Sequence, residues 1–596
     1  MTITAFTAGT YVQDRNTANL VSQKARLDAL STQLASGRTA ETYGGIGAAR
    51  TTSLSAHASL SALDGYDAAI TANTTRVTVT TSAVTQLSSL SGILQQSLNS
   101  STTGTASTVT QVARNSLDAA VDALNQDVAG NYVFGGRISD TAPVASADAI
   151  LNGVPGLGLD GLKTLVTEQI AADLGPNGNG RIATSASGST VTVSEEGTGT
   201  AGTEARANFG FKLISATSSN PAAITAGDKT GGTAPDVTFT VANAPAEGDR
   251  IRVAINQPDG SQTFTDLTVT ANPQVDATNT IPLGTAAETA AALTKKFEGQ
   301  PVASIQGKAS LGLAANFGTG TPASVELTVK APPAAGDTLT FNLALRDGTT
   351  QSITLTAKAN ADSAATTEFS LTGDVAANIS KALSNALKET AGTTLSASSA
   401  SRASQDFFAG SKSEGFAPRR VSEDGNGYAE QASTKTVIWY TGDDTSADPR
   451  TTATVQIGTD RKLGIGAQAN EAPIRAILAG IAQVAVQSFT PSTSGSPETA
   501  RYNAVSERAR SLLTSSDGRE GVQSIASDLS LAAKTMADTK TDNRSARAAL
   551  EDSLDGVDSV SIEEVTAKLL ALQNQLQASY QVTSMLSKLT LTNYLS

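Results

Sequence analysis

The sequence contains no cysteine and a single histidine, His57. The absence of cysteine excludes disulfide bonds, thiolate zinc sites and cysteine nucleophiles. A histidine-dependent catalytic triad would have to use His57, which lies between Ala56 and Ala58 in a helical stretch without any accompanying motif. We therefore interpret His57 as a helix-surface or inter-helix residue, and expect no catalytic site, no metal and no cofactor.

Aromatic residues make up 4% of the chain and charged residues 16%, with a net charge of −13 and no long basic run. Nucleic-acid binding requires a clustered basic face, and electrostatic membrane anchoring requires a polybasic segment, so neither partner is expected. No stretch approaches the ~18 apolar residues of a membrane-spanning helix, and the N-terminal segment lacks the apolar core of a secretion signal. The chain is thus expected to be cytoplasmic and soluble, or to be exported by a route that reads an uncleaved N-terminus.

Both ends of the chain carry apolar stripes at the a/d spacing of paired helices. Fully burying one leucine is worth about 1.5–3 kcal/mol, so each stripe must find a partner helix. That partner is the other end of the chain or the same ends of a neighbouring subunit. We predict that these stripes form an assembly interface, with Leu20, Leu27, Leu30 and Leu34 near the N-terminus and Ile562, Val565, Leu569, Leu572, Leu576 and Leu586 near the C-terminus.

Long helices are predicted inside these ends. Residues 56–98 place apolar side chains at a/d positions with polar members at Asn73, Thr80 and Ser91, and a second helix is expected over 107–129. Residues 522–550 continue one register, and Asp555-Gly556 is expected to interrupt it before the terminal stripe begins.

The middle of the chain, from about 191 to 457, reads as short strands and turns, and it contains an internal repeat. Residues 239–255 (FTVANAPAEGDRIRVAI) match 327–343 (LTVKAPPAAGDTLTFNL) with an offset of 88. Each copy is predicted to form strand, Gly-Asp turn, strand, Asp-Gly hairpin, strand and an Ala-rich helix. We expect two tandem α+β modules inserted into a helical scaffold.

The predicted fold class is therefore α+β, with a long α-helical coiled-coil or bundle scaffold formed by both termini and a mostly β insertion. At 596 residues the chain exceeds what one hydrophobic core supports. The expected domains are a terminal coiled-coil assembly domain (1–40 plus 556–596), a long-helix bundle (41–175 plus 461–555), a β-rich middle domain (176–235 plus 411–460), inserted repeat 1 (236–323) and inserted repeat 2 (324–410).

Two short motifs favour structural readings over ligand sites. Gly156, Gly158 and Gly161 satisfy G-x-G-x-x-G, but no strong strand precedes them, and a flexible turn before a helix from Leu162 is the better interpretation. Asp443, Asp444 and Asp448 lack the glycine and terminal glutamate of a calcium loop, and we expect a solvated hairpin tip.

Three segments resemble one known family. Residues 30–38 (LSTQLASGR) look like the N-terminal signature of bacterial flagellins and their hook-associated relatives. Residues 130–144 (GNYVFGGRISDTAPV) resemble the G-x-Y-x-F-x-G…D-T-x-P segment of the hook–filament junction proteins, the hook-associated protein 3 family. Residues 572–595 (LQNQLQASYQVTSMLSKLTLTNYL) are similar to the C-terminus of that family, especially 577–581 and 593–595. The large insert in the middle of this chain is a difference from a minimal junction protein.

The resemblance implies paired terminal helices in a coiled coil that lines the inner wall of a filament, with the long helices as the next shell and the middle facing outward. It also implies export of the unfolded chain through the flagellar type III channel, without a cleaved signal, and it suits a chain without cysteine.

The function expected from the resemblance is that of a non-enzymatic, extracellular structural subunit of the bacterial flagellum, an adaptor at the hook–filament junction. Its expected partners are further copies of itself in a ring or helical homo-oligomer, a neighbouring hook-associated protein, flagellin and an export chaperone. Two alternatives stay open: flagellin itself, as the main filament subunit, and a secreted adhesin or binding module that uses the tandem repeats.

Overall fold

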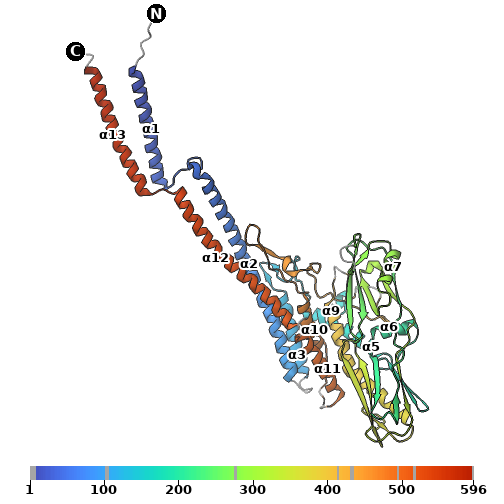
Figure 1. Ribbon diagram of the computed structural model, residues 1–596. Helices are drawn as coiled ribbons and strands as arrows, with labels where there is room; N and C mark the ends of the chain where they lie inside the picture. Colours follow the sequence, from blue (N-terminus) through green and yellow to red (C-terminus); the bar gives the residue numbers. More distant parts are fainter. Residues whose placement is uncertain are drawn as a thin grey trace. The chain divides into compact units, whose positions relative to one another are not determined.

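The computed structural model describes residues 8–100, 106–273, 278–411, 415–429, 435–490, 492, 495–514 and 518–592. The chain divides into two compact units. Unit 1 comprises Met1–Thr74, Val455–Leu463 and Ala533–Ser596, and unit 2 comprises Thr75–Thr454 and Gly464–Ala532. Long helices lie near both ends of the chain and strands in its middle, so the predicted α+β class is confirmed (Figure 1).

Four long helices dominate the two ends of the chain. They are α1 (Ala8–Ser36), α2 (Arg50–Ser100, 51 residues), α12 (Arg519–Asp558, 40 residues) and α13 (Ile562–Thr592). The expected break at Asp555-Gly556 is wrong, because α12 continues to Asp558. A glycine inside an exposed helix costs only about 1 kcal/mol, whereas Ser561 offers a side-chain cap that starts a new helix. Its hydroxyl accepts a hydrogen bond from Glu564 N at 3.2 Å.

Within unit 1, α2 and α12 pack through both apolar and polar side chains. Ile70 and Met536 are each 1% exposed. Asn543 Nδ2 donates to Asp67 Oδ1 at 2.8 Å, and Lys540 Nζ donates to Thr71 Oγ1 at 2.8 Å. These hydrogen bonds between α2 and α12 restrict the register of the pair.

The helical part of unit 2 contains the rest of α2, the start of α12 and four more helices. These are α3 (Ala106–Leu124), α9 (Ser396–Phe408), α10 (Ala472–Ala485) and α11 (Pro497–Thr514). Thr80 and Ser91 are fully buried on α2, as the stripe predicted. Thr80 Oγ1 donates to Arg76 O at 2.8 Å and Ser91 Oγ to Leu513 O at 3.2 Å, so neither hydroxyl is left unpaired.

The predicted end of α3 at residue 129 is wrong, because the helix stops at Leu124. Asn125 Nδ2 donates to Val144 O at 2.8 Å and its Oδ1 accepts from Val144 N at 3.0 Å, which draws the chain away from the helix axis. A hairpin of β1 (Asp127–Val128) and β2 (Asn131–Tyr132) follows. Its turn residues Ala129 and Gly130 have φ of 53° and 80°, as a type I′ turn requires.

The strands of the middle build two α+β modules. Module 1 contains β7 (Val237–Val241), β8 (Arg250–Asn256), β9 (Gln262–Thr270), β10 (Thr280–Pro282), α7 (Ala286–Lys296), β11 (Val302–Gly307) and β12 (Leu313–Phe317). Module 2 contains β3 (Ile182–Ser187), β4 (Thr190–Glu195), β5 (Lys212–Ser218), β6 (Ile224–Ala226), β13 (Ser324–Val329), β14 (Thr338–Ala344), β15 (Thr350–Lys358), β16 (Glu368–Ser370) and α8 (Val375–Thr390). Each has its own apolar core.

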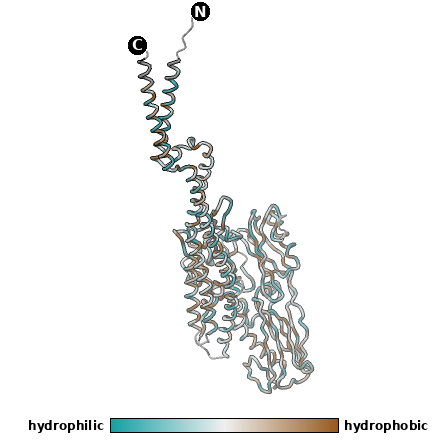
Figure 2. The backbone as a smooth tube through the Cα atoms, turned by 60° about the vertical axis from the view of Figure 1, so that its left-hand side comes forward, coloured by the Kyte–Doolittle hydropathy of each residue, from teal (hydrophilic) through white to brown (hydrophobic). Residues whose placement is uncertain are grey.

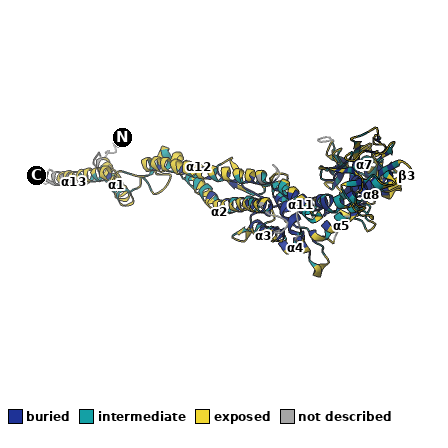
Figure 3. Cartoon of the chain, turned by 90° about the horizontal axis from the view of Figure 1, so that it is seen from below, coloured by how far each residue is buried: buried dark blue, intermediate teal, exposed yellow. Residues whose placement is uncertain are grey.

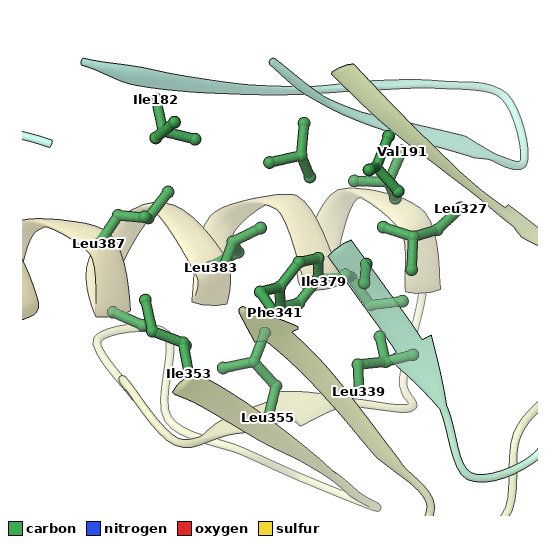
Figure 4. Close-up of a cluster of buried hydrophobic side chains, with 14 of the residues drawn as sticks. Ile182, Val191, Leu327, Leu339, Phe341, Ile353, Leu355, Ile379, Leu383 and Leu387 are labelled. Carbon is green, nitrogen blue, oxygen red and sulfur yellow. The ribbon is translucent and has the colours of Figure 1, made fainter. Parts of the chain in front are cut away.

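In module 2, α8 lies between two four-stranded sheets of order β3-β4-β13-β6 and β16-β15-β14-β5. Figure 4 shows Ile182, Val191 and Leu327 on one side of the helix, and Leu339, Ile353 and Leu355 on the other. The helix turns Ile379, Leu383 and Leu387 into this core, and all three are at most 1% exposed. The buried residues of α8 thus form one broad face that contacts both sheets, and Ala377, Lys381 and Lys388 are exposed on the opposite face.

The two modules pair their strands at positions 88 residues apart. In module 1, Arg250 faces Thr268, and Thr268 faces Thr280 in the parallel pair. In module 2, Thr338 faces Thr356, and Thr356 faces Glu368 in the parallel pair. The Gly-Asp turns also agree, because Asp249 Oδ2 accepts from Ala246 N and Asp337 Oδ2 from Ala334 N, each at 2.8 Å.

The edge strands of the modules differ in chain order. The fourth strand of the module 1 sheet is β11, which follows α7, whereas the fourth strand of the corresponding module 2 sheet is β5, which precedes module 1. Strand β13 likewise pairs with β4 and β6. The segment predicted as repeat 2 (324–410) therefore shares both of its sheets with residues of the predicted middle domain (176–235), and module 1 sits in the chain between β6 and β13.

The remaining elements are short: η1 (Gly47–Ala49), α4 (Ala147–Asn152), η3 (Pro155–Leu157), α5 (Leu162–Leu174), α6 (Gly199–Asn208), η4 (Ala309–Leu311), η5 (Ala391–Leu395), η6 (Pro449–Thr452), β17 (Thr454–Gln456) and β18 (Lys462–Gly464). Residues 437–440 form no strand, and Tyr440 makes only an isolated bridge to Val144. Trp439 is fully buried there, and its indole N–H donates to Phe408 O at 3.0 Å. Burial of the large rings decides the path of this segment.

Candidate assembly surface

The two terminal helices α1 and α13 lie side by side within unit 1 (Figure 1). Neither contains proline, and Gly9 is the only glycine in either, so both sequences favour long helices. In the described part of the chain, these two helices are therefore partners for each other, one of the two arrangements that the stripes allowed.

The predicted interface residues differ in how far this pairing covers them. Val565 and Leu576 are 4% and 9% exposed, so they are buried within the single chain. Leu20, Leu27, Leu30, Leu34, Leu569 and Leu572 are half-buried along the same line of contact. Ile562 lies in the first turn of α13 and is 56% exposed. Leu586 lies in α13, but its side chain falls outside the described residues. We call the half-buried and buried members of this set the seam residues.

The other faces of α13 carry apolar side chains without cover. Leu570, Val582 and Met585 are 54%, 55% and 63% exposed, and Tyr580 is 58% exposed. Figure 3 shows both terminal helices largely in the colours of exposed and intermediate residues, and Figure 2 shows hydrophobic residues distributed along their length. A helix that is apolar on several faces is typical of one surrounded by partners.

The same helix has an unusual distribution of charge. Its charged residues are Glu563, Glu564, Lys568 and Lys588, and residues 569–587 contain none. Surface helices ordinarily carry charged residues on the solvent side. In α13, nineteen consecutive residues without charge therefore leave an uncharged surface exposed on the single chain.

On α1, two large side chains point away from the seam. Tyr11 and Val21 are 66% and 64% exposed. This helix also carries charges at Asp14, Arg15, Lys24, Arg26 and Asp28. Its outer face is therefore mixed, and α13 offers the more apolar surface.

A set of hydrogen bonds joins the ends of the terminal helices to the rest of unit 1. Thr39 N donates to Asp558 O at 2.7 Å, and Val560 N donates to Gly37 O at 3.1 Å. Arg38 and Ser559 form an antiparallel bridge. We call residues 37–39 and 557–560 the joint, because the chain passes there between α1 and α2 on one side and between α12 and α13 on the other.

The only histidine lies beside this joint. Ser53 Oγ donates to Asp558 Oδ2 at 3.0 Å, and His57 Nε2 lies 3.0 Å from the same oxygen. Because the serine hydroxyl donates to the carboxylate and not to the imidazole, His57 does not activate it as a nucleophile. The geometry supports the inter-helix reading of His57, with Asp558 as the shared acceptor.

We expect the stability of the joint to depend on pH, because the joint includes the carboxyl group of Asp558. Burial alone would raise the pKa of this carboxyl, but hydrogen bonds from Ser53 and His57 and the charges of His57 and Arg38 together lower it. A carboxyl with a lowered pKa stabilises the folded state above its unfolded pKa, and this contribution is lost as the pH falls through the folded value. We therefore expect opening of the joint to increase below about pH 4. Amide hydrogen exchange of Thr39 and Val560, corrected for intrinsic rates, measures it.

The variant Asp558→Asn should exchange these amides faster at neutral pH and lose the acid dependence. The matched control is Asp555→Asn, an exposed carboxylate three residues earlier on α12. If wild type and Asp558→Asn exchange alike between pH 3 and 7, the carboxylate does not hold the joint.

The segments that carry the family resemblance lie in several places. Residues 30–38 end α1 and enter the joint, and residues 577–581 lie in α13; residues 593–595 are outside the described part of the chain. Residues 130–144 lie wholly within unit 2, where they begin at the β1–β2 hairpin and include the fully buried Val133 and Phe134. Tyr440 Oη donates to Phe134 O at 3.3 Å and to Asp443 O at 3.1 Å.

The aspartates of the predicted hairpin tip are structural. Asp443 is 5% exposed, and the expectation of a solvated position is wrong for it. Its carboxylate accepts hydrogen bonds from Thr445 N at 3.0 Å and from Ser446 Oγ at 2.6 Å, which offset the cost of burial. Asp448 caps η6 by accepting from Arg450 N at 2.9 Å. Within the described ranges, no group of three or more His, Asp or Glu side chains is placed to hold a metal ion.

The glycine motif also lies in a turn. Gly158 ends η3 with a φ of 65°, and Gly161 precedes α5, which begins at Leu162 as predicted. The residues before the motif form a single bridge between Val154 and Leu159 and no strand. A dinucleotide site would need a strand at this position.

Comparison of the sequence with protein-family models and with curated proteins finds no match. Among the residues that the structure describes, no helix has both the length and the apolar character needed to cross a membrane.

The sequence pattern identified the seam residues and missed the exposed set. Leu570, Tyr580, Val582 and Met585 fall outside a/d positions, so a search for helical periodicity passes over them. The sequence feature that could have indicated them is the uncharged run from 569 to 587. Because this run covers about five turns of helix, it includes every face of α13 and not only the a/d stripe.

Proposed function

We propose that this chain is a structural subunit of the bacterial flagellum, an adaptor at the hook–filament junction, which assembles through its terminal helices. The observation that carries the proposal is the uncharged run from 569 to 587 in α13, which has apolar side chains on several faces while α1 covers only one of them. The resemblance of residues 30–38, 130–144 and 572–595 to the flagellin superfamily names the assembly.

The proposed mechanism is geometric. Pairing of α1 with α13 presents the exposed face of α13 to neighbouring copies, and burial of Leu570, Val582 and Met585 supplies the free energy of assembly. The joint sets the angle at which the terminal helices leave α2 and α12. In the assembled state the terminal helices form a coiled coil. The two modules, which we propose are copies of one ancestral unit, take no part in it.

The same proposal implies the partners and the location. The chain is exported without a cleaved signal, escorted by a chaperone that covers its terminal helices. It acts outside the cell, between a neighbouring hook-associated protein and flagellin, and it performs no catalysis.

Deletion of residues 572–596 tests this mechanism. The deletion removes most of the uncharged run and the partner of α1, so we expect loss of incorporation into the flagellum and loss of motility. The measurement is swimming of a strain that carries only the truncated gene, with the protein detected in the culture medium.

Folding of unit 2 is the control for this deletion. Trp439 is the only tryptophan and is fully buried in unit 2, so its fluorescence should be unchanged in the purified truncated chain. Normal swimming of the truncated strain would contradict the mechanism.

The position and copy number of the protein separate the adaptor from flagellin. A fluorescent label is expected at the base of the filament in few copies; label along the whole filament would assign the chain to flagellin instead. Label on the cell surface of a strain without flagella would favour an adhesin that uses the modules.

A further inference from the structure

Unit 2 contains a cavity of about 500 Å³ at which the hairpin turns of both modules meet α9, α10 and α11. Its charged lining is dominated by arginine: Arg346, Arg402, Arg419 and Arg475 against two carboxylates, Asp347 and Asp406. This cavity lies in the compact unit that excludes the terminal helices, so its role is separate from assembly.

Both carboxylates of the lining are already committed to other groups. Arg508 Nε lies 2.5 Å from Asp347 Oδ2, and both side chains are less than a tenth exposed. Arg419 binds Asp406 twice, through Nε at 3.0 Å and through its backbone N–H at 2.7 Å. Neither carboxylate of the wall pairs with Arg346 or Arg402; Arg402 instead forms an ion pair with Asp173, which lies outside the lining.

Arg346 is 2% exposed, and part of its guanidinium has no acceptor. Its Nη2 donates to the carbonyl oxygens of Arg206 and Phe209, and Nη1 reaches Asn256 Oδ1 at 3.5 Å. Its Nε is buried without a hydrogen-bond partner. Burial and the neighbouring Arg402 lower the pKa of Arg346 to about 10, so the group stays cationic at neutral pH.

Arg402 also has a buried guanidinium nitrogen without a hydrogen-bond acceptor. Its Nη2 donates to Tyr428 Oη at 3.2 Å and to Asn208 O at 3.4 Å. Its Nη1 is buried without a hydrogen bond, 3.6 Å from Asp173 Oδ2. Buried donors without acceptors are rare in native proteins, and two of them in one cavity wall indicate a ligand or ordered water that supplies the acceptors.

We propose that this cavity binds a small organic oxyanion, whose carboxylate or phosphate group is held by Arg346, Arg402 and Arg475. Guanidinium groups are well suited to such groups because their N–H donors match two oxygens at once. The remaining wall offers the ring of Phe264, which is 42% exposed, and the alanines of α10 for a carbon skeleton. The volume lies in the range of small-molecule sites, about 300–1,000 Å³, and exceeds what a bare phosphate fills.

Isothermal titration of the full-length chain at low ionic strength tests the proposal. The probes are glucuronate, glucose 6-phosphate, inorganic phosphate and, as the neutral compound, glucose. We expect saturable binding of glucuronate or glucose 6-phosphate, weaker binding of phosphate and none of glucose. The stronger of the two sugar anions identifies the acidic group; absence of binding by both overturns the proposal.

Arg475 provides the decisive variant because it is only half-buried, and its loss should leave the fold intact. Arg475→Gln is expected to weaken binding of the sugar anion at least tenfold, with circular dichroism and Trp439 fluorescence unchanged. The matched control is Arg510→Gln on α11, which removes the same charge outside the cavity lining and should leave binding within twofold. Equal loss in both variants, or no loss in Arg475→Gln, would place the anion elsewhere.

A second variant separates the two parts of the ligand. Phe264→Ala should weaken the sugar anions about fivefold or more and leave inorganic phosphate unaffected, because phosphate has no skeleton to pack against the ring. An equal effect on phosphate and sugar anions would contradict the assigned role of Phe264. None of these outcomes depends on the terminal helices.

Discussion

A chain that carries Leu570→Gln, Val582→Gln and Met585→Gln is expected to fold as the wild type does and to fail in assembly. The three side chains are 54%, 55% and 63% exposed on α13, so their replacement leaves the contact with α1 unchanged. Glutamine is uncharged and favours helix as well as most residues do, so α13 itself should be preserved.

The expected size of the effect follows from burial. Complete burial of such a side chain is worth about 1.5–3 kcal/mol, and each of these is already nearly half covered, which leaves about 1 kcal/mol per residue. Loss of about 3 kcal/mol at each contact between subunits weakens association roughly a hundredfold. Sedimentation of the purified chain after seeding with filament fragments measures the loss in solution, and motility measures it in cells.

A seam variant is the control for this experiment. Leu569→Ala and Leu572→Ala remove half-buried side chains on the face toward α1, so they should reduce the helicity of the free chain before any partner is present. The outer-face variant should show no such change in circular dichroism. If the outer-face variant assembles normally, the exposed residues of α13 do not drive assembly.

Replacement of Asp347 by alanine should destabilise unit 2 by about 3–5 kcal/mol, because it leaves the buried Arg508 without its carboxylate. The pair joins the hairpin turn of module 2 to α11, and its two side chains are 8% and 9% exposed. Arg508 also donates to Thr349 Oγ1 at 3.1 Å, which cannot balance the charge. Urea denaturation followed by Trp439 fluorescence measures the change in the free energy of unfolding.

Module 1 contains a matched control for this variant. Asp259 occupies the same place in its own hairpin turn, where Oδ1 accepts from Ser261 N at 2.9 Å; the corresponding bond of Asp347 comes from Thr349 N at 3.1 Å. Asp259 is exposed and pairs with no arginine in the described structure. Asp259→Ala should therefore cost only about 1 kcal/mol, the value of the turn hydrogen bonds. Equal costs for the two variants would mean that Arg508 does not depend on Asp347.

The loss of stability caused by Arg508→Ala should be smaller in acid than at neutral pH. Burial alone would raise the pKa of Asp347, but Arg508 and Thr349 together lower it in the folded wild type. The wild type thus gains stability from this carboxylate above about pH 4 and loses it as the pH falls further. Without Arg508, the buried carboxyl loses the charge that lowers its pKa, so the two proteins should differ most at neutral pH.

Helical periodicity predicted the long helices and their buried faces, but not where the helices end. The a/d stripe of residues 56–98 corresponds to the buried side of α2, including Thr80 and Ser91. The end of α3 at Leu124 depends on a side-chain bond between Asn125 and Val144, and the end of α12 depends on the cap at Ser561. Such bonds join residues that a periodic pattern does not relate.

The sequence match at an offset of 88 led us to expect a hairpin in each segment, and the two observed hairpins pair their strands at positions 88 residues apart. The match did not predict that module 2 takes β5 from before module 1. A strand needs at least one neighbouring strand, but its local sequence pattern does not say which strand that is. The difference between β11 and β5 is visible only in three dimensions.

For the candidate assembly surface, the predicted stripe residues with described side chains are half-buried or buried in the single chain, except Ile562; that they form an interface between subunits stays a prediction. The sequence did not predict that Val565 and Leu576 are buried within one chain, because an a/d stripe does not say whether its partner belongs to the same molecule. The other faces of α13 can be identified as exposed only after the structure shows that α1 covers one face.

Module 1 is inserted in the chain between strands β6 and β13 of module 2, so it can be replaced as a whole. Its entry strand β7 and exit strand β12 are neighbours, with Val237 facing Phe317, so the chain leaves module 1 beside the point where it enters. Such geometry lets a whole folded unit be lost, lengthened or exchanged through a short linker, while the host sheets close beneath it. Sequence diversity among related chains should therefore concentrate in module 1, because changes there leave the sheets of module 2 intact.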